Sequence, residues 1–210
     1  MKPYIKEACV ETFNEAIKAE SLGADRIELC SQLLLDGLTP KLDLIEQLYN
    51  SLKIPIKVMV RPRDGNFIYS DIEIEEMKNT IQFCKEIGVF GVVFGVLNNN
   101  KELDIEKIKR LSAKAKPMNV CIHKAIDETD DIIKETNELC KIKEVNSILT
   151  SGKAVTALEG RFLLQEMMRI SKNKLTVIPA GKVTNKNIKQ LHKTLSAKEY
   201  HGRKIVGNLN

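Results

Sequence analysis

The sequence predicts an α/β fold in which parallel strands close into a (β/α)8 TIM barrel whose last helix is absent or shortened. Short β-branched runs alternate with longer segments whose apolar residues recur at helical spacing, a pattern typical of parallel sheets. Eight such strands fit within 210 residues. No Gly-x-Gly-x-x-Gly turn follows the first strand, which argues against a doubly wound sheet. Only Gly202 to Asn210 remain after the eighth strand.

The elements are expected in strict alternation along the chain. The predicted strands are Ile5–Val10, Arg26–Leu29, Ile56–Val60, Gly91–Phe94, Asn119–His123, Ser147–Leu149, Leu175–Pro179 and Glu199–His201. The predicted helices are Thr12–Leu22, Leu42–Leu52, Ile72–Ile87, Ile105–Ala115, Asp130–Cys140, Ala157–Ser171 and Asn185–Leu195. Thr12 and Asp71 are expected to cap helices, because their side-chain oxygens can accept the free amide hydrogens of a first turn. Gly23 and Gly88 follow helices, where a left-handed residue is least costly as glycine.

Composition favours one domain over residues 1–210, with 43% hydrophobic residues to form its core. The formal net charge is +5, but the lysines are interleaved with acidic residues, as on solvated helix faces. A nucleic-acid-binding protein would instead cluster its basic residues beside stacking aromatics, which here make up only 5% of the chain. No secretory signal and no run of 18 apolar residues is present. We therefore expect a cytoplasmic protein with no nucleic-acid or membrane partner.

The five cysteines form an odd set with no closely spaced pair. This argues against a disulfide framework and against a structural zinc site, so reduced thiols are expected. Cys84 and Cys140 lie on apolar helix faces and are expected in the core. Cys121 alternates with His123 along one strand, so the two side chains should share a face.

Polar residues gather where the predicted strands end, which in parallel barrels is the functional face. They are Glu7, Cys9, Glu28, Cys30, Arg61, Arg63, His123, Lys124, Asp127, Ser151, Gly152, Gly181 and His201. Charged groups this close to a core need partners or a ligand. The set as a whole favours a small-molecule site, although each residue alone also has a structural interpretation.

Acid–base chemistry is one interpretation of this set. Arg61 and Arg63 could form bidentate hydrogen bonds to a carboxylate or phosphate, or could each form a structural ion pair. His123 could move a proton with Glu28 or Asp127 as its partner, or could be a satisfied buried histidine. The other polar residues at the strand ends are given roles in the same site. Glu7 is a further catalytic candidate, and the candidate substrate-binding residues are Lys124, Ser151, Gly152, Gly181 and His201.

Several segments resemble the CutC family of copper homeostasis proteins, which are built as (β/α)-barrels. They are Glu7-Ala8-Cys9-Val10, Gly23-Ala24-Asp25-Arg26-Ile27-Glu28-Leu29-Cys30, Gly37-Leu38-Thr39-Pro40, Val60-Arg61-Pro62-Arg63-Asp64-Gly65, Tyr69-Ser70-Asp71, Gly91-Val92-Val93-Phe94-Gly95, Ile122-His123-Lys124-Ala125-Ile126-Asp127, Leu149-Thr150-Ser151-Gly152 and Ala157-Leu158-Glu159-Gly160. They occur in the family's order along nearly the whole chain. The chain departs from the family pattern at Lys124, where the family usually has arginine, and at Ala180 and Lys182 in the glycine-rich turn after the seventh strand.

The resemblance implies that the protein binds Cu(I), with Cys9 and Cys30 as the thiolate ligands proposed for the family. Cu(I) is soft and favours thiolate, and two ligands can suffice. The two cysteines end adjacent parallel strands, about 4.8 Å apart, and could converge. Alternatively, each is a small buried apolar residue. Cys121 is a weaker third candidate.

Three functional hypotheses follow. The first is a cytosolic CutC-type protein that binds or traffics Cu(I). The second is a barrel enzyme acting on a small anionic or carbohydrate-like metabolite by acid/base chemistry. The third is a binding or oligomeric scaffold, because a missing closing helix would leave apolar barrel surface for a second subunit to cover. A homo-oligomer is therefore expected.

Overall fold

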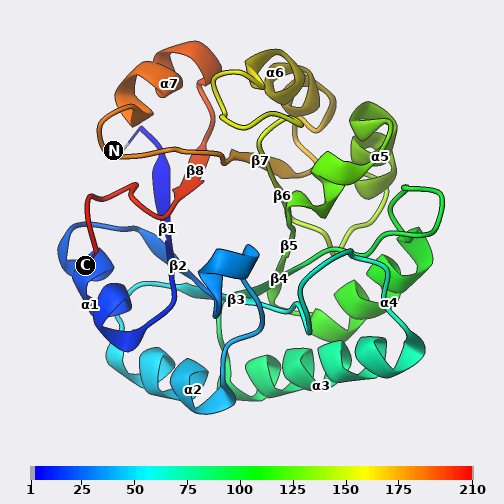
Figure 1. Cartoon of the computed structure of the whole chain (residues 1–210), viewed down its shortest axis with the longest axis horizontal. Coiled ribbons are helices and arrows are strands. Elements are labelled where there is room, and N and C mark those ends of the chain that lie inside the picture. Colours follow the sequence, from blue (N-terminus) through cyan, green and yellow to red (C-terminus); the bar gives the residue numbers. More distant parts are fainter. Residues whose placement is uncertain (1–2, 210) are drawn as a thin grey trace.

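The structure is a computed structural model that describes residues 3–209, and in that range eight parallel strands alternate with seven α-helices. The strands are β1 Ile5–Val10, β2 Arg26–Leu29, β3 Ile56–Met59, β4 Gly91–Phe94, β5 Asn119–Ile122, β6 Ser147–Thr150, β7 Thr176–Pro179 and β8 Glu199–Gly202. The helices are α1 Phe13–Ser21, α2 Leu42–Ser51, α3 Asp71–Ile87, α4 Ile105–Ala115, α5 Ile132–Leu139, α6 Arg161–Ile170 and α7 Ile188–Leu195. Figure 1 shows the helices as a ring around the strands. The predicted TIM barrel is confirmed.

The strands follow one another around the barrel, and β8 pairs in parallel with β1. The seam between β7 and β8 carries a single bridge between the segments that follow them, from Thr184 to Lys204. Gly202 allows this close approach, because a Cβ there would lie 2.2 Å from the Val183 carbonyl oxygen. A larger residue at this position would therefore open the seam.

Helix boundaries shift where a capping residue lies elsewhere than predicted. Thr12 caps α1 as expected, accepting the Glu15 amide. Asp71, however, is the first residue of α3, and Ser70 caps that helix in a reciprocal capping box with Glu73. Gly23 and Gly88 both have the expected left-handed backbone. The sequence pattern did not predict two short 3-10 helices at the strand ends, η1 Leu33–Leu35 and η2 Lys124–Glu128.

The segment after β8 forms turns and a bridge residue and contains no helix up to residue 209, so the expected absence of a closing helix holds for the described residues. Ile205, Val206 and Leu209 are buried against the same apolar cluster that the helices cover. In Figure 1 this red segment runs outside the strands between α7 and α1. The chain thus covers this part of its own barrel wall, and the homo-oligomer stays a prediction.

Two apolar layers hold the barrel together. A large cluster fills the space between strands and helices, and a smaller one lies inside the barrel. Side chains alternate between the two on β1 and on β3 to β7, as the period of a strand requires. On β1, for example, Ala8 and Val10 join the outer cluster and Cys9 joins the inner one. Within residues 3–209, no helix combines the length and apolar character needed to cross a membrane.

Candidate functional site

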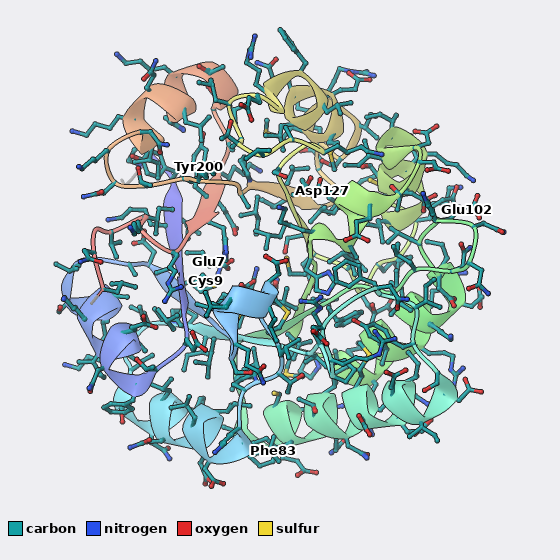
Figure 2. The ribbon with its side chains drawn as sticks, in the orientation of Figure 1. Glu7, Cys9, Phe83, Glu102, Asp127 and Tyr200 are labelled. Atoms are coloured by element: carbon teal, nitrogen blue, oxygen red, sulfur yellow. The ribbon has the colours of Figure 1, made fainter. Side chains whose placement is uncertain are left out.

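A cavity of about 410 Å³ opens where the strands end, and most of the predicted site residues surround it. Cys9, Glu28, Cys30 and His201 line one part of its wall, and His123 and Asp127 line another. In Figure 2 the labelled Cys9 lies beside Glu7 near β1, whereas Asp127 lies across the barrel mouth. The cavity is therefore bounded by two groups of polar residues that belong to different strands.

Cys9 and Cys30 meet at the cavity wall because β1 and β2 are adjacent. Parallel pairing sets Cys9 opposite Glu28, and the Cys30 amide donates to the Val10 carbonyl just beyond the strands. The two sulfur atoms lie 3.9 Å apart, and the Cys30 thiol lies 3.5 Å from Glu28 Oε2. Both cysteines are buried, with Cys9 the more exposed at 8%. The expected convergence of these two thiols is confirmed.

A network of buried charges lies beneath the thiols and centres on Glu7, which is fully buried. The Glu7 carboxylate accepts hydrogen bonds from Arg26 Nε at 2.5 Å and interacts with His201 Nδ1 at 3.0 Å. Lys57 Nζ lies 3.4 Å from the same carboxylate and is itself only 1% exposed. Arg26 also bonds to Glu199. Sequence reasoning missed Lys57, although a lysine inside the apolar run of β3 was a usable signal.

This network determines the protonation of Glu7 and His201. Burial alone would raise the pKa of Glu7, but Lys57, His201 and Arg26 hold it well below its usual range. Burial would likewise lower the pKa of His201, yet Glu28, Cys9 and Glu7 raise it well above its usual range. The imidazole is therefore a buried cation between an anionic carboxylate and the thiol pair.

The same surroundings make the two thiols unequal. Hydrogen bonding from Cys30, together with His201, lowers the pKa of Cys9 to about 5, against the effect of burial. The bond to Cys9 and burial raise the pKa of Cys30 well above its usual value. Burial also raises the pKa of Glu28 to about 8. At neutral pH the pair therefore holds one thiolate and one thiol, a state suited to binding a soft cation.

His123 lies on the other part of the wall, next to the ring of Phe67 at 4.8 Å between centroids. It follows β5, and its Nδ1 accepts the Ala125 amide at 3.2 Å. Gly95 leaves room for the imidazole, since a Cβ there would lie 2.7 Å from Nδ1. Burial, and secondarily the charge of Arg61, lowers the pKa of His123 to about 3, so the ring is neutral. Its Nε2 has no hydrogen-bond partner among the described residues.

The structure directs the two arginines away from the cavity and into the surrounding loops. The Arg61 guanidinium donates to the carbonyls of Leu35, Gly37 and Gly65 and lies over the Phe67 ring. It thereby holds η1 over the barrel mouth, where this short blue helix is seen in Figure 1. Arg63 bonds to Glu73 Oε1 at 2.5 Å and to carbonyls of the loop after β3. Neither arginine lines the cavity with its side chain.

Asp127 organises the loop after β6. Its carboxylate accepts hydrogen bonds from the Thr150 hydroxyl, from the Ser151 amide and hydroxyl, and from the Lys153 amide at 3.0 Å. The Gly152 amide donates to Thr150 Oγ1 at 2.9 Å. The backbone amides of Ser151 and Gly152, two of the candidate substrate-binding residues, thus bond to protein acceptors. Gly181, Lys124 and Lys182, by contrast, line the cavity on this side.

Among the cysteines, Cys121 lies inside the barrel as expected, but it does not line the cavity with Cys9 and Cys30. Burial raises its pKa. Cys84 is fully buried on α3, as predicted, and Cys140 is half-buried at the end of α5. None of these three joins the thiol pair within the described residues.

The donor set at the thiol pair fits a soft metal ion. Ligand atoms of Cys9, Glu28 and Cys30 all lie within 4.8 Å of one another. Metal–thiolate bonds are about 2.3 Å long, so one ion can contact two sulfur atoms that lie 3.9 Å apart with little movement. Glu28 Oε1 also lacks a hydrogen-bond partner among the described residues and is free to approach an ion.

Fold and site together define a TIM-barrel protein with a buried thiol pair at the functional ends of its first two strands. The model of the CutC family matches residues 4–206, and the chain belongs to that family.

Named relatives agree with this assignment. The copper homeostasis protein cutC homologs of Homo sapiens and Mus musculus are each 37% identical over 198 residues, which cover 94% of this chain and 72% of theirs. A crystal structure described as that of a CutC copper homeostasis protein from Streptococcus agalactiae superposes with a TM-score of 0.90 at 26% identity, covering 96% of this chain and 99% of that one. An aldolase called QR15 superposes with a TM-score of 0.71 at 12% identity over 99% of this chain and 93% of its own, which shows a shared fold alone.

Proposed function

We propose that this protein binds Cu(I) through Cys9 and Cys30 and serves copper homeostasis in the cytosol. The observation that carries the proposal is the 3.9 Å separation of two buried sulfur atoms. The lowered pKa of Cys9, about 5, favours its thiolate at neutral pH. Soft thiolate ligands select Cu(I) over the hard cations that prefer oxygen. The names of the relatives, which are copper homeostasis proteins, support the same function.

The oxygen and nitrogen donors nearby favour the thiols as the metal site. Glu7, Glu28 and His201 form a second group whose ligand atoms lie within 4.8 Å of one another. Arg26 and Lys57 already neutralise Glu7, and the raised pKa of His201 keeps its ring nitrogens protonated. A metal ion would have to displace these cations, whereas at the thiols it displaces at most one proton.

The position of His201 also suits a singly charged ion. Its imidazolium lies 3.0 Å from Glu7 and 3.6 Å from Glu28, close to the thiol pair. Two thiolates around Cu(I) carry a net charge of −1, which this cation can neutralise in a buried environment. A reducing compartment keeps both the thiols and the metal in the required state.

An anaerobic competition titration against a chromophoric Cu(I) chelator tests the proposal. We expect the wild-type protein to bind one ion, and the double variant Cys9→Ala/Cys30→Ala to bind at least about a hundredfold more weakly, since even second-shell changes cost about ten- to a hundredfold. Cys140→Ala removes a half-buried thiol far from the pair in sequence and fold, and it should bind as the wild type does. Unchanged affinity in the double variant, with an unchanged melting profile, would remove the assignment from these thiols.

A further inference from the structure

Two buried polar atoms at the cavity lack a hydrogen-bond partner among residues 3–209, namely Glu28 Oε1 and His123 Nε2. Their residues are 2% and 4% exposed. More than about nine in ten buried polar groups in folded proteins are satisfied, so each exception calls for an explanation. Two exceptions around one cavity point to a molecule that enters the cavity and bonds to both.

The two atoms require complementary chemistry of that molecule. His123 Nδ1 accepts the Ala125 amide hydrogen, so the proton of the neutral ring lies on Nε2, which must donate. Glu28 Oε2 accepts from Cys30 and faces His201, so a proton on this carboxyl would lie on Oε1, which then donates and otherwise accepts. The ligand therefore presents an oxygen acceptor to His123 and, to Glu28, a hydroxyl, which can both donate and accept.

The rest of the lining indicates a neutral ligand with both apolar and polar faces. Met59, Phe67 and Leu149 supply apolar wall. The outer lining holds both signs of charge, so a ligand of either charge would meet residues of its own sign: Lys124, Lys182 and Arg203 against Asp36, Asp127 and Glu128. The C–H faces of a polyhydroxylated molecule suit the apolar wall, and its hydroxyls can bond to charges of both signs.

The size of the cavity agrees with such a ligand. Its volume of about 410 Å³ lies within the range of about 300–1,000 Å³ typical of small-molecule pockets. An ion held at Cys9 and Cys30 needs only a small part of this space. It also leaves His123 unsatisfied, because a protonated ring nitrogen cannot coordinate a metal.

We propose that the cavity binds a small, neutral, polyhydroxylated molecule of the carbohydrate class, held by hydrogen bonds to His123 Nε2 and Glu28 Oε1. This site extends beyond the Cu(I) site to His123 on the opposite wall and shares Glu28 with it, while the contact at His123 does not depend on the metal. Of the two ligand classes that the sequence left open, the proposal selects the carbohydrate-like one over the anionic one.

Saturation-transfer NMR on the copper-free protein tests the inference, with D-fructose, D-glucitol and D-gluconate as probes. We expect saturation transfer to both neutral probes, with a signal that saturates as the probe concentration rises. Gluconate should bind no more tightly than glucitol. Failure of both neutral probes to bind would overturn the proposal and leave water as the occupant. Preferential binding of gluconate would overturn the neutral class of ligand.

Two variants of His123 test the assigned contact. His123→Asn keeps an acceptor for the Ala125 amide but loses the donor at the Nε2 position, so binding should weaken roughly tenfold. His123→Gln places an amide donor near that position and should restore most of the affinity. Equal binding by all three proteins, each still folded with a cooperative melting transition, would contradict the role of Nε2. Because copper titration of Cys9→Ala/Cys30→Ala is a separate readout, failure of either site is recognised independently.

Discussion

Two parts of the barrel mouth carry charged residues at strand ends. One part is formed by β1, β2 and β8, and the other by the loops after β3, β5 and β6. In the first part, Glu7, Glu28 and His201 bond to other side chains and surround a pair of thiols. In the second, Arg61 and Asp127 bond mainly to backbone groups of neighbouring loops. Charge at a strand end can thus either tune a reactive group or shape the loops around it.

The difference in partners has an energetic consequence. Side-chain charges buried against one another leave an uncompensated charge when one member is removed, which is costly. A carboxylate that accepts backbone amides leaves polar but uncharged groups behind, some of which water can reach. We therefore expect the first part to be more sensitive to loss of charge than the second.

The largest effect is expected for Glu7→Gln. The substitution preserves size but removes the anion that Arg26, Lys57 and His201 share. We expect the free energy of unfolding to fall by about 3–5 kcal/mol, as when a buried ion pair loses one partner. Urea denaturation followed by circular dichroism measures it. The control Glu166→Gln breaks a surface pair with Arg169 and should leave the midpoint nearly unchanged. Equal effects of the two variants would contradict the buried network.

A smaller loss is expected for Asp127→Asn. The amide nitrogen introduced there would face the donors of the loop after β6, namely Thr150, Ser151 and Lys153. Loss of these charge-assisted hydrogen bonds should lower the free energy of unfolding by about 1.5–3 kcal/mol. The exposed neighbour Glu128 provides the control Glu128→Gln, which should be close to neutral. A loss as large as that of Glu7→Gln would erase the contrast between the two parts of the mouth.

The fold followed from the sequence because its determinants are local and repeated. Alternation of β-branched runs with helical periodicity predicted all seven helices and eight strands of the described residues, with errors confined to their ends. Those ends depend on single capping side chains. For α3, both Ser70 and Asp71 can cap, and only the reciprocal bond with Glu73 selects Ser70.

The thiol pair was also predictable, since equivalent ends of adjacent parallel strands must lie close together. The partners of the arginines were not. Arg61 bonds to carbonyls of Leu35 and Gly37, more than twenty residues earlier in the chain, and such contacts between loops leave no periodic signal. Lys57 was missed for another reason. Both faces of a barrel strand are buried, so the pattern of apolar residues does not show which face the lysine occupies.

The effect that is smallest per pH unit concerns the pH dependence of stability at His123, on the loop side of the mouth. In the folded protein its pKa is lowered to about 3 from a usual value of 6.5, mainly by burial and also by Arg61. Its contribution to stability is therefore complete above about pH 6.5 and is lost as the pH falls from there towards 3, because only the unfolded chain binds the proton.

Comparing wild type with His123→Asn by denaturation at several pH values isolates this contribution from the opposite titration of His201. Between pH 6 and 4 the wild type should lose up to about 1.4 kcal/mol per pH unit more than the variant. The variant should also lose some stability at every pH, since the imidazole packs against Phe67. Parallel pH profiles for the two proteins would mean that the His123 ring takes up a proton in the folded state. Each part of the mouth would then contain a cationic histidine, and the hydrogen-bond donor assigned to His123 Nε2 would be a charged group.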